Sequence, residues 1–159
     1  MFTFPNPVNE TSARLVAGGV VLMAVGVLVL GQHWLLIPLA YGFLARVATG
    51  PTLSPLGQLV TRVVTPRLDV PVKEVPGPPK RFAQGIGAVL GVTASVLYFA
   101  FGLAAAADAL IALLLIAATL ESVFAYCLGC KAFALLMRTG VVPEAVCEEC
   151  NDIWSRAAA

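Results

Sequence analysis

Long runs of uncharged, apolar residues constrain this chain more than any other feature of its sequence. Residues 15–45 and residues 82–107 contain no Asp, Glu, Lys or Arg. About 20 consecutive apolar residues are enough for a helix to cross the hydrocarbon core of a bilayer. Because 59% of the chain is hydrophobic and only 12% is charged, we predict an integral membrane protein rather than a soluble domain.

Polar residues divide this apolar sequence into four predicted helices. Gln32 and His33 interrupt the first run, and Asp108, a suitable N-cap, begins a fourth helix that only Glu121 interrupts. The predicted spans are residues 13–31, 34–49, 82–105 and 108–128. The fold class is therefore predicted as an all-α membrane protein whose four transmembrane helices form two hairpins. Residues 1–138 make the transmembrane domain, and residues 139–159 make a cysteine-containing tail with a short helix.

Basic residues are absent from both predicted hairpin tips, at residues 32–33 and 104–108. All ten lie in or beside the N-terminal segment, the central loop at residues 50–81 and the C-terminal part of the chain: Arg14, Arg46, Arg62, Arg67, Lys73, Lys80, Arg81, Lys131, Arg138 and Arg156. Since Lys and Arg remain on the cytosolic side of membrane proteins, both termini, the central loop and the C-terminal tail are predicted to be cytosolic.

The central loop contains seven prolines, which exclude one continuous helix over residues 50–81. One short helix fits within it, because Ser54 can cap a helix and Pro55 suits its first turn. Five apolar residues follow at helical spacing: Leu56, Leu59, Val60, Val63 and Val64. We predict either an interfacial helix on the inner leaflet or a segment packed against the bundle.

Small residues in the third predicted span indicate close helix packing. Gly87 and Gly91 form a G-x-x-x-G step. This spacing lets the backbones of two membrane helices approach each other closely.

Four cysteines form the most specific motif of the chain. Cys127, Cys130, Cys147 and Cys150 have the spacing C-x2-C-x16-C-x2-C. In a cytosolic setting this is a spacing of zinc sites, in which two thiolate pairs complete a tetrahedron. The same pairs also suit a dithiol that forms and breaks a disulfide, or that accepts sulfur from a partner. A third alternative is that the cysteines are unreactive and merely packed.

Neighbouring charges distinguish the two cysteine pairs. Lys131 lies one helical turn beyond Cys127 and is expected to favour its thiolate form. Three acidic residues surround the second pair: Glu148, Glu149 and Asp152. The Cys127–Cys130 pair is therefore predicted to be the better nucleophile, and the Cys147–Cys150 pair the better resolving partner.

Glu121 is an ionisable residue inside the fourth predicted span, where a charge requires a partner or a role. Arg46, near the cytosolic end of the second span, is the expected partner, and this intramembrane pair would lock the hairpins together. This structural role is favoured over a proton or ion pathway, because one isolated acid makes a poor relay. His33 is the only histidine and is expected to be a solvated residue at an external tip. With a net charge of +1 and no basic segment interleaved with aromatic residues, the chain gives no indication of nucleic-acid binding.

The segment Phe124-Ala125-Tyr126-Cys127-Leu128-Gly129-Cys130-Lys131 resembles a bacterial membrane-protein family catalogued as domain of unknown function 4395. Further matching segments are residues 9–14, 43–46, 54–56, 80–85 and 120–121, so that the resemblance covers most of residues 5–135. It implies a four-helix protein of the bacterial plasma membrane. Because the genes of similar proteins often lie beside those of thiosulfate sulfurtransferases and small thioredoxin-like proteins, it also implies sulfur handling or thiol redox at Cys127 and Cys130.

Two functions remain as hypotheses. The first is a membrane-anchored thiol or sulfur relay that serves a sulfurtransferase or a thioredoxin-like protein. The second is a non-enzymatic accessory subunit of a larger membrane complex or homo-oligomer, whose tail is joined to the bundle by one zinc ion bound to the four cysteines. A small transporter for a sulfur anion ranks last, because Glu121 would repel anions.

Overall fold

The computed structural model describes residues 4–146 of the 159-residue chain, and these residues are almost entirely helical. The long helices are α1 (Glu10–Leu30), α5 (Gly77–Phe99) and α6 (Ala104–Phe124). A shorter helix α2 (Leu36–Thr49) follows a 3-10 turn over His33–Leu35. After α6, the amphipathic helix α7 (Leu128–Arg138) precedes a 3-10 turn at Glu144–Val146.

The central segment forms a short helix and then a strand. The helix consists of α3 (Pro55–Leu59), a π-helical stretch (Val60–Val64) and α4 (Thr65–Arg67). The two-residue strand β2 (Glu74–Val75) pairs antiparallel with β1 (Val8–Asn9), with Val8 opposite Val75. This ladder and the hydrogen bond from the Gly77 N–H to the Asn6 side chain attach the N-terminal segment to the start of α5.

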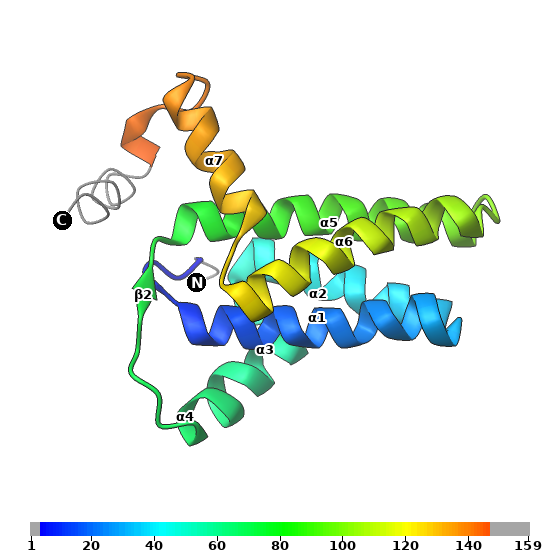
Figure 1. Cartoon of the computed structure of the whole chain (residues 1–159), viewed down its shortest axis with the longest axis horizontal. Coiled ribbons are helices and arrows are strands. Elements are labelled where there is room, and N and C mark those ends of the chain that lie inside the picture. Colours follow the sequence, from blue (N-terminus) through cyan, green and yellow to red (C-terminus); the bar gives the residue numbers. More distant parts are fainter. Residues whose placement is uncertain (1–3, 147–159) are drawn as a thin grey trace.

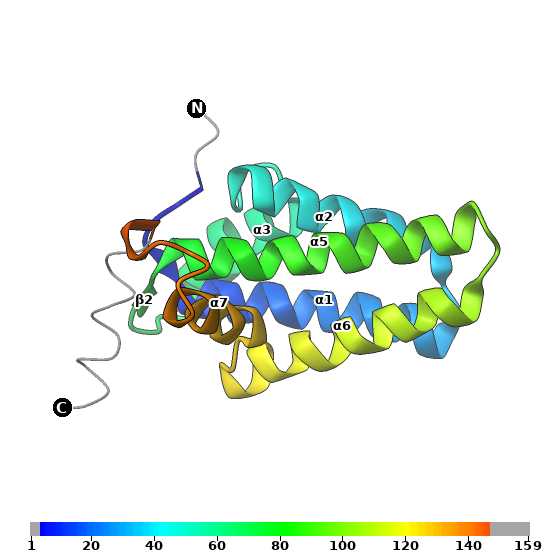
Figure 2. The same cartoon turned by 90° about the horizontal axis from the view of Figure 1, so that it is seen from above.

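Four helices form a bundle in which α2 packs on α5, α5 packs on α6, and α6 packs on α1 (Figures 1 and 2). The strongest packing joins α1 to α6 and α2 to α5, whereas the consecutive helices α1 and α2 scarcely touch. Their buried core consists largely of small and aliphatic side chains such as Val20, Ala24, Leu39 and Ile111. Each of the four helices therefore packs most closely on a helix from the other half of the chain. In the second predicted hairpin, the two helices α5 and α6 also pack on each other.

Close approach of α2 and α5 depends on the glycines of α5. A Cβ at Gly87 would overlap the Phe43 ring, and one at Gly91 would lie 3.3 Å from Leu39. These are the two residues of the G-x-x-x-G step, and they form the close helix contact that the sequence predicts.

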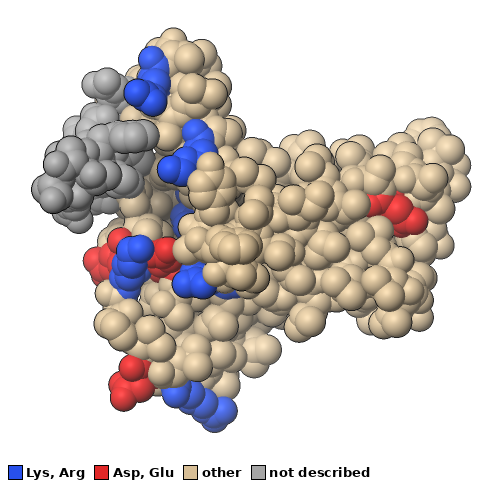
Figure 3. Space-filling model, in the orientation of Figure 1, with Lys and Arg blue, Asp and Glu red and all other residues tan. Residues whose placement is uncertain are grey.

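The two ends of the bundle differ in charge: basic residues gather at one end, and the two predicted hairpin tips lie at the other. Lys and Arg side chains gather at the left end of Figure 3, where the N-terminal segment, β2 and α7 also lie, whereas the flanks of the long helices show an uncharged surface except for one acidic patch near the opposite end. The two tips, formed by residues 31–35 and 100–103, lie together at the opposite end (Figure 1). This separation of charge is the arrangement on which the predicted topology depends.

Among the described residues, three helices are long and apolar enough to cross a membrane, namely α1, α5 and α6. This finding supports a membrane protein. The helix α2 has only 14 residues, so it falls short of the length that a perpendicular crossing requires.

Several helix boundaries differ from those predicted. The third helix begins at Gly77 rather than at residue 82, because Pro78 and Pro79 occupy the first turn, where the missing N–H groups are not needed. The next helix begins at Ala104, so Asp108 lies inside it and is not its N-cap. The short helix of the central loop does begin as predicted, with the Ser54 side chain accepting the Gly57 N–H and Pro55 in the first turn.

The apolar face of this short helix is divided between the bundle and the surface. Val60 is buried and Leu56 packs against Gly19 of α1, whereas Leu59 and Val63 are exposed. One side of the helix therefore contacts the protein, and the other side is exposed. The helix predicted in the tail lies outside the described residues.

Candidate functional site

The first cysteine pair lies where α6 ends and α7 begins. Ala125 adopts a left-handed conformation with φ 55° and terminates α6, and Cys127 is the N-cap of α7. Gly129 allows α7 to pack on α5, since a Cβ at this position would lie 2.5 Å from the Ala83 side chain. The backbone around the C-x-x-C motif is therefore held against the basic end of the bundle.

Cys127 and Cys130 are free thiols that interact directly with each other. The Cys127 sulfur accepts the Cys130 N–H at 3.3 Å, and the two side chains are also hydrogen-bonded. Cys127 is 9% exposed, and Cys130 is half-buried. A thiol at a helix N-terminus receives an N–H donor and the favourable end of the helix dipole, both of which stabilise the thiolate.

The two thiols have opposite acidities. The hydrogen bond from Cys130 lowers the pKa of the Cys127 thiol below its ordinary value of 9.0, and the positive charge of Lys80 acts in the same direction. The hydrogen bond to Cys127, burial and the negative charge of Cys127 raise the pKa of Cys130. Cys127 is thus the thiol that ionises first.

Lys80 is the cation that faces this pair. Its ammonium Nζ lies 2.5 Å from Glu121 Oε1, and both side chains are largely buried. Lys80 also acts electrostatically on both thiols. Lys131, which the sequence favoured for this role, instead lies 5.6 Å above the Tyr126 ring.

Arg46 is not the direct partner of Glu121. It donates from Nε to Gln84 Oε1 at 2.9 Å and from Nη1 to Ser54 Oγ at 3.2 Å. The charge of Glu121 acts on Arg46 without a salt bridge between them in the described part of the chain. The predicted intramembrane pair is therefore corrected to Lys80–Glu121, which joins α5 to α6 rather than one hairpin to the other.

Sequence reasoning missed Lys80 because the residue lies among the prolines of the central segment and was assigned to a loop. Once Pro78 and Pro79 are placed in the first turn of α5, Lys80 follows in that same turn. It then lies on a helix that packs directly against α6 and α7. The segment at residues 80–85, already noted for its resemblance, was the available signal.

The second pair, Cys147 and Cys150, lies outside the described residues. Within residues 4–146, no group of three or more His, Cys, Asp or Glu side chains could hold a metal ion. The tetrad predicted for zinc is consequently neither supported nor excluded.

His33 departs from its expected solvated position. Its Nε2 lies 3.0 Å from Asp108 Oδ1, and its ring stacks on Tyr98 with the ring centroids 4.2 Å apart. These contacts join the two tips, far from the thiol pair.

These features define a helical protein with three membrane-length helices and a dithiol at the basic end of its bundle. The chain belongs to the family described as Domain of unknown function (DUF4395), whose model matches residues 8–138. The resemblance noted in the sequence is thereby confirmed. No curated protein and no solved structure matches the chain.

Proposed function

We propose that the protein is a membrane-anchored thiol redox or sulfur relay in which Cys127 is the nucleophile and Cys130 the resolving thiol. The observation that carries this proposal is the position of Cys127 as N-cap of α7, with its sulfur accepting the Cys130 N–H. Low-pKa cysteines of C-x-x-C motifs at helix N-termini are the ones that react with disulfides.

Each exchange begins at Cys127. Its thiolate attacks one sulfur of a partner's disulfide, a mixed disulfide forms, and the partner's second sulfur leaves as a thiolate. Cys130 then loses its proton, attacks the Cys127 sulfur and releases the partner's remaining sulfur as a thiolate. The pair loses two electrons and two protons, and the partner's disulfide becomes two thiols. A partner persulfide would react at the same atom, with its terminal sulfur passing to Cys127 and the partner leaving as a thiolate.

The order of the two steps follows from their coupled acidities. The negative charge of Cys127 is one of the causes that keep Cys130 protonated. This charge disappears once Cys127 enters a mixed disulfide, so Cys130 becomes easier to ionise when its attack is required.

In this proposal, Cys147 and Cys150 exchange electrons with the first pair and pass them to a soluble partner. The resemblance suggests a thiosulfate sulfurtransferase or a thioredoxin-like protein as that partner.

The proposed setting is the bacterial plasma membrane, with α2 and its preceding 3-10 turn as a fourth, tilted crossing and with both termini cytosolic. The gathering of Lys and Arg at one end of the bundle supports this sidedness (Figure 3). A membrane-impermeant thiol reagent applied to intact cells should leave Cys127 unlabelled and should label a cysteine introduced at Gln32. Labelling of the native cysteines from outside would refute this orientation.

The decisive experiment is metal analysis of protein purified without chelator, combined with thiol counts before and after reduction. Metal-free protein with a reducible Cys127–Cys130 bridge supports the relay. One zinc ion per chain with unreactive thiols would refute it and support the accessory-subunit alternative. Lys80→Gln should slow alkylation of Cys127 near neutral pH, whereas the matched Lys131→Gln should not, because of these two lysines Lys80 is the one whose charge acts on the thiols.

A further inference from the structure

The helix α7 leaves the bundle at its basic end and runs across the long axis of the bundle (Figures 1 and 2). It packs mainly on α5 and has few contacts with α6. When α1, α5 and α6, the helices long enough to cross a membrane, span a bilayer, the membrane normal follows the bundle axis. A helix that runs across this axis at the end of the bundle then lies parallel to the membrane surface.

The protein covers only part of the apolar surface of α7. Phe133 is buried and packs on Phe82 and Met137. In contrast, Leu128 and Leu135 are 42% and 60% exposed. These two leucines are seven residues apart, which is about two helical turns, so they lie on the same face of the helix. The helix therefore presents a second apolar face that stays exposed in the described structure.

A cation lies on this same exposed face. Lys131 follows Leu128 by three residues and precedes Leu135 by four, and both spacings place side chains next to each other on a helix. Lys131 is exposed, and its Nζ lies 5.6 Å from the centre of the Tyr126 ring. Tyrosine is enriched where a membrane meets water. Leucines flanked by a lysine and a tyrosine are typical of a helix that lies on an anionic membrane surface.

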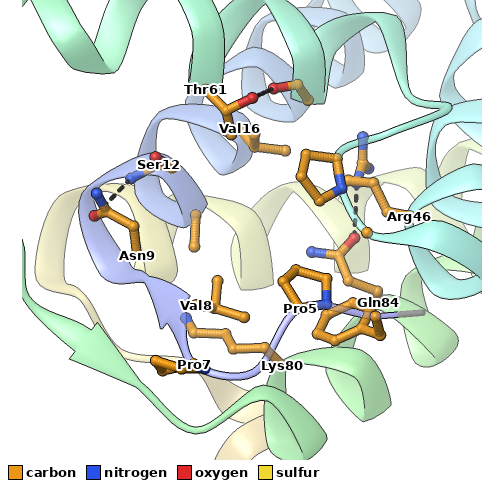
Figure 4. A pocket seen from close by; sticks show the side chains of 15 residues that line it. Pro5, Pro7, Val8, Asn9, Ser12, Val16, Arg46, Thr61, Lys80 and Gln84 are labelled. Carbon is orange, nitrogen blue, oxygen red and sulfur yellow. Dashed lines mark hydrogen bonds between the residues drawn. The ribbon is translucent and has the colours of Figure 1, made fainter. Parts of the chain in front are cut away.

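Two other cations at the basic end are turned inward and cannot reach such a surface. Figure 4 shows Arg46 directed at Gln84, and Lys80 extending along the wall of the cavity beside the N-terminal segment. Arg46 is buried, and the ammonium group of Lys80 is paired with Glu121. Lys131 differs from both because its side chain is exposed.

The exposed face of α7 continues the apolar flank of the bundle. Val123 and Phe124, at the end of α6, are exposed, and so are Tyr126 and Leu128, which follow on either side of the buried Cys127. Lipid that surrounds the membrane-length helix α6 would therefore reach α7 as well. This continuity favours lipid, rather than a separate protein, as the partner of the exposed face.

We propose that α7 lies in the headgroup layer of the leaflet that meets the basic end of the bundle. Leu128 and Leu135 enter the boundary of the acyl chains, and Lys131 binds the phosphate of an anionic phospholipid. Because Cys127 is the N-cap of α7, this contact also holds the dithiol at headgroup depth. The inference rests on the membrane-crossing fold and does not depend on thiol exchange.

The test places photoreactive benzoyl-phenylalanine at position 135 of the full chain, in nanodiscs of equal parts phosphatidylglycerol and phosphatidylcholine. The matched control carries the same probe in place of Val72, an exposed apolar residue between α4 and β2. After irradiation, mass spectrometry should detect lipid adducts at position 135 and few at position 72. Phosphatidylglycerol should exceed phosphatidylcholine among these adducts by about fivefold, the factor for one lysine near an anionic surface.

Lys131→Gln should reduce this excess to near parity, whereas the matched Arg62→Gln, an exposed arginine of the π-helical stretch, should leave it unchanged. A second probe, in place of Leu128, repeats the measurement if the probe at position 135 disturbs folding. Four results would overturn the proposal: crosslinks to protein in place of lipid, no lipid adducts at either probe, equal yields at positions 135 and 72, or a phosphatidylglycerol excess that is absent or survives Lys131→Gln.

Discussion

The Lys80–Glu121 ion pair allows a quantitative test of how the bundle is held together. The two side chains are 10% and 14% exposed, and their charged atoms lie 2.5 Å apart. Lys80→Met alone would leave a mostly buried carboxylate without its direct partner, which costs about 3–5 kcal/mol of folding free energy. Glu121→Gln alone would leave the ammonium group in the same condition. The double variant removes both charges and should recover about 2–3 kcal/mol relative to the sum of the two single losses.

The assay is equilibrium unfolding in mixed detergent micelles, followed by tryptophan fluorescence. A matched double-mutant cycle with Arg46→Met and Glu121→Gln serves as the control. Since Arg46 donates to Gln84 and Ser54 and makes no salt bridge with Glu121 in the described structure, this second cycle should give a coupling energy below about 1 kcal/mol.

Two results would refute this reasoning. If the Lys80–Glu121 cycle is additive to within about 0.5 kcal/mol, the ion pair does not stabilise the contact between α5 and α6. If the Arg46–Glu121 cycle gives the larger coupling, the pairing first inferred from the sequence holds in the membrane, and the geometry described above does not.

Three further predictions concern packing and the thiols. Gly87→Ala should destabilise the protein despite the gain in helix propensity, because overpacking against the Phe43 ring costs about 1–3 kcal/mol. The matched Gly85→Ala, whose new Cβ meets no atom within 4 Å, should stabilise the protein in the same unfolding assay. Cys127→Ser should keep the melting temperature within a few degrees, since serine is also an N-cap, while Cys127→Ala should cost about 0.5–2 kcal/mol and both should lose thiol exchange. Alkylation of Cys127 should reach half its maximal rate below pH 9.0, and Cys130→Ala should move that midpoint upward. Because folding lowers the pKa of Cys127, the folding stability that its thiolate contributes is present above pH 9.0 and is lost as the pH falls through the pKa of the folded state.

The helical architecture could be predicted because the apolar runs dictate it. Uncharged residues over 82–107 leave few alternatives to a buried or membrane-crossing helix. Boundaries were less predictable, since Pro78 and Pro79 are read as helix breakers unless they fall in the first turn. The separation of α1 from α2 could not be deduced either, because packing of these similar apolar faces is decided by small residues such as Gly18, which lies close to Ser122 of α6.

The candidate site was predictable only where it is local in sequence. The spacing of Cys127 and Cys130 identifies the pair, and their mutual hydrogen bonds follow from one helical turn. The cation was misassigned because Lys131 is a sequence neighbour, whereas Lys80 approaches through the packing of α7 on α5. Contacts between distant segments decide which charge a thiol experiences, and single-sequence spacing does not encode them.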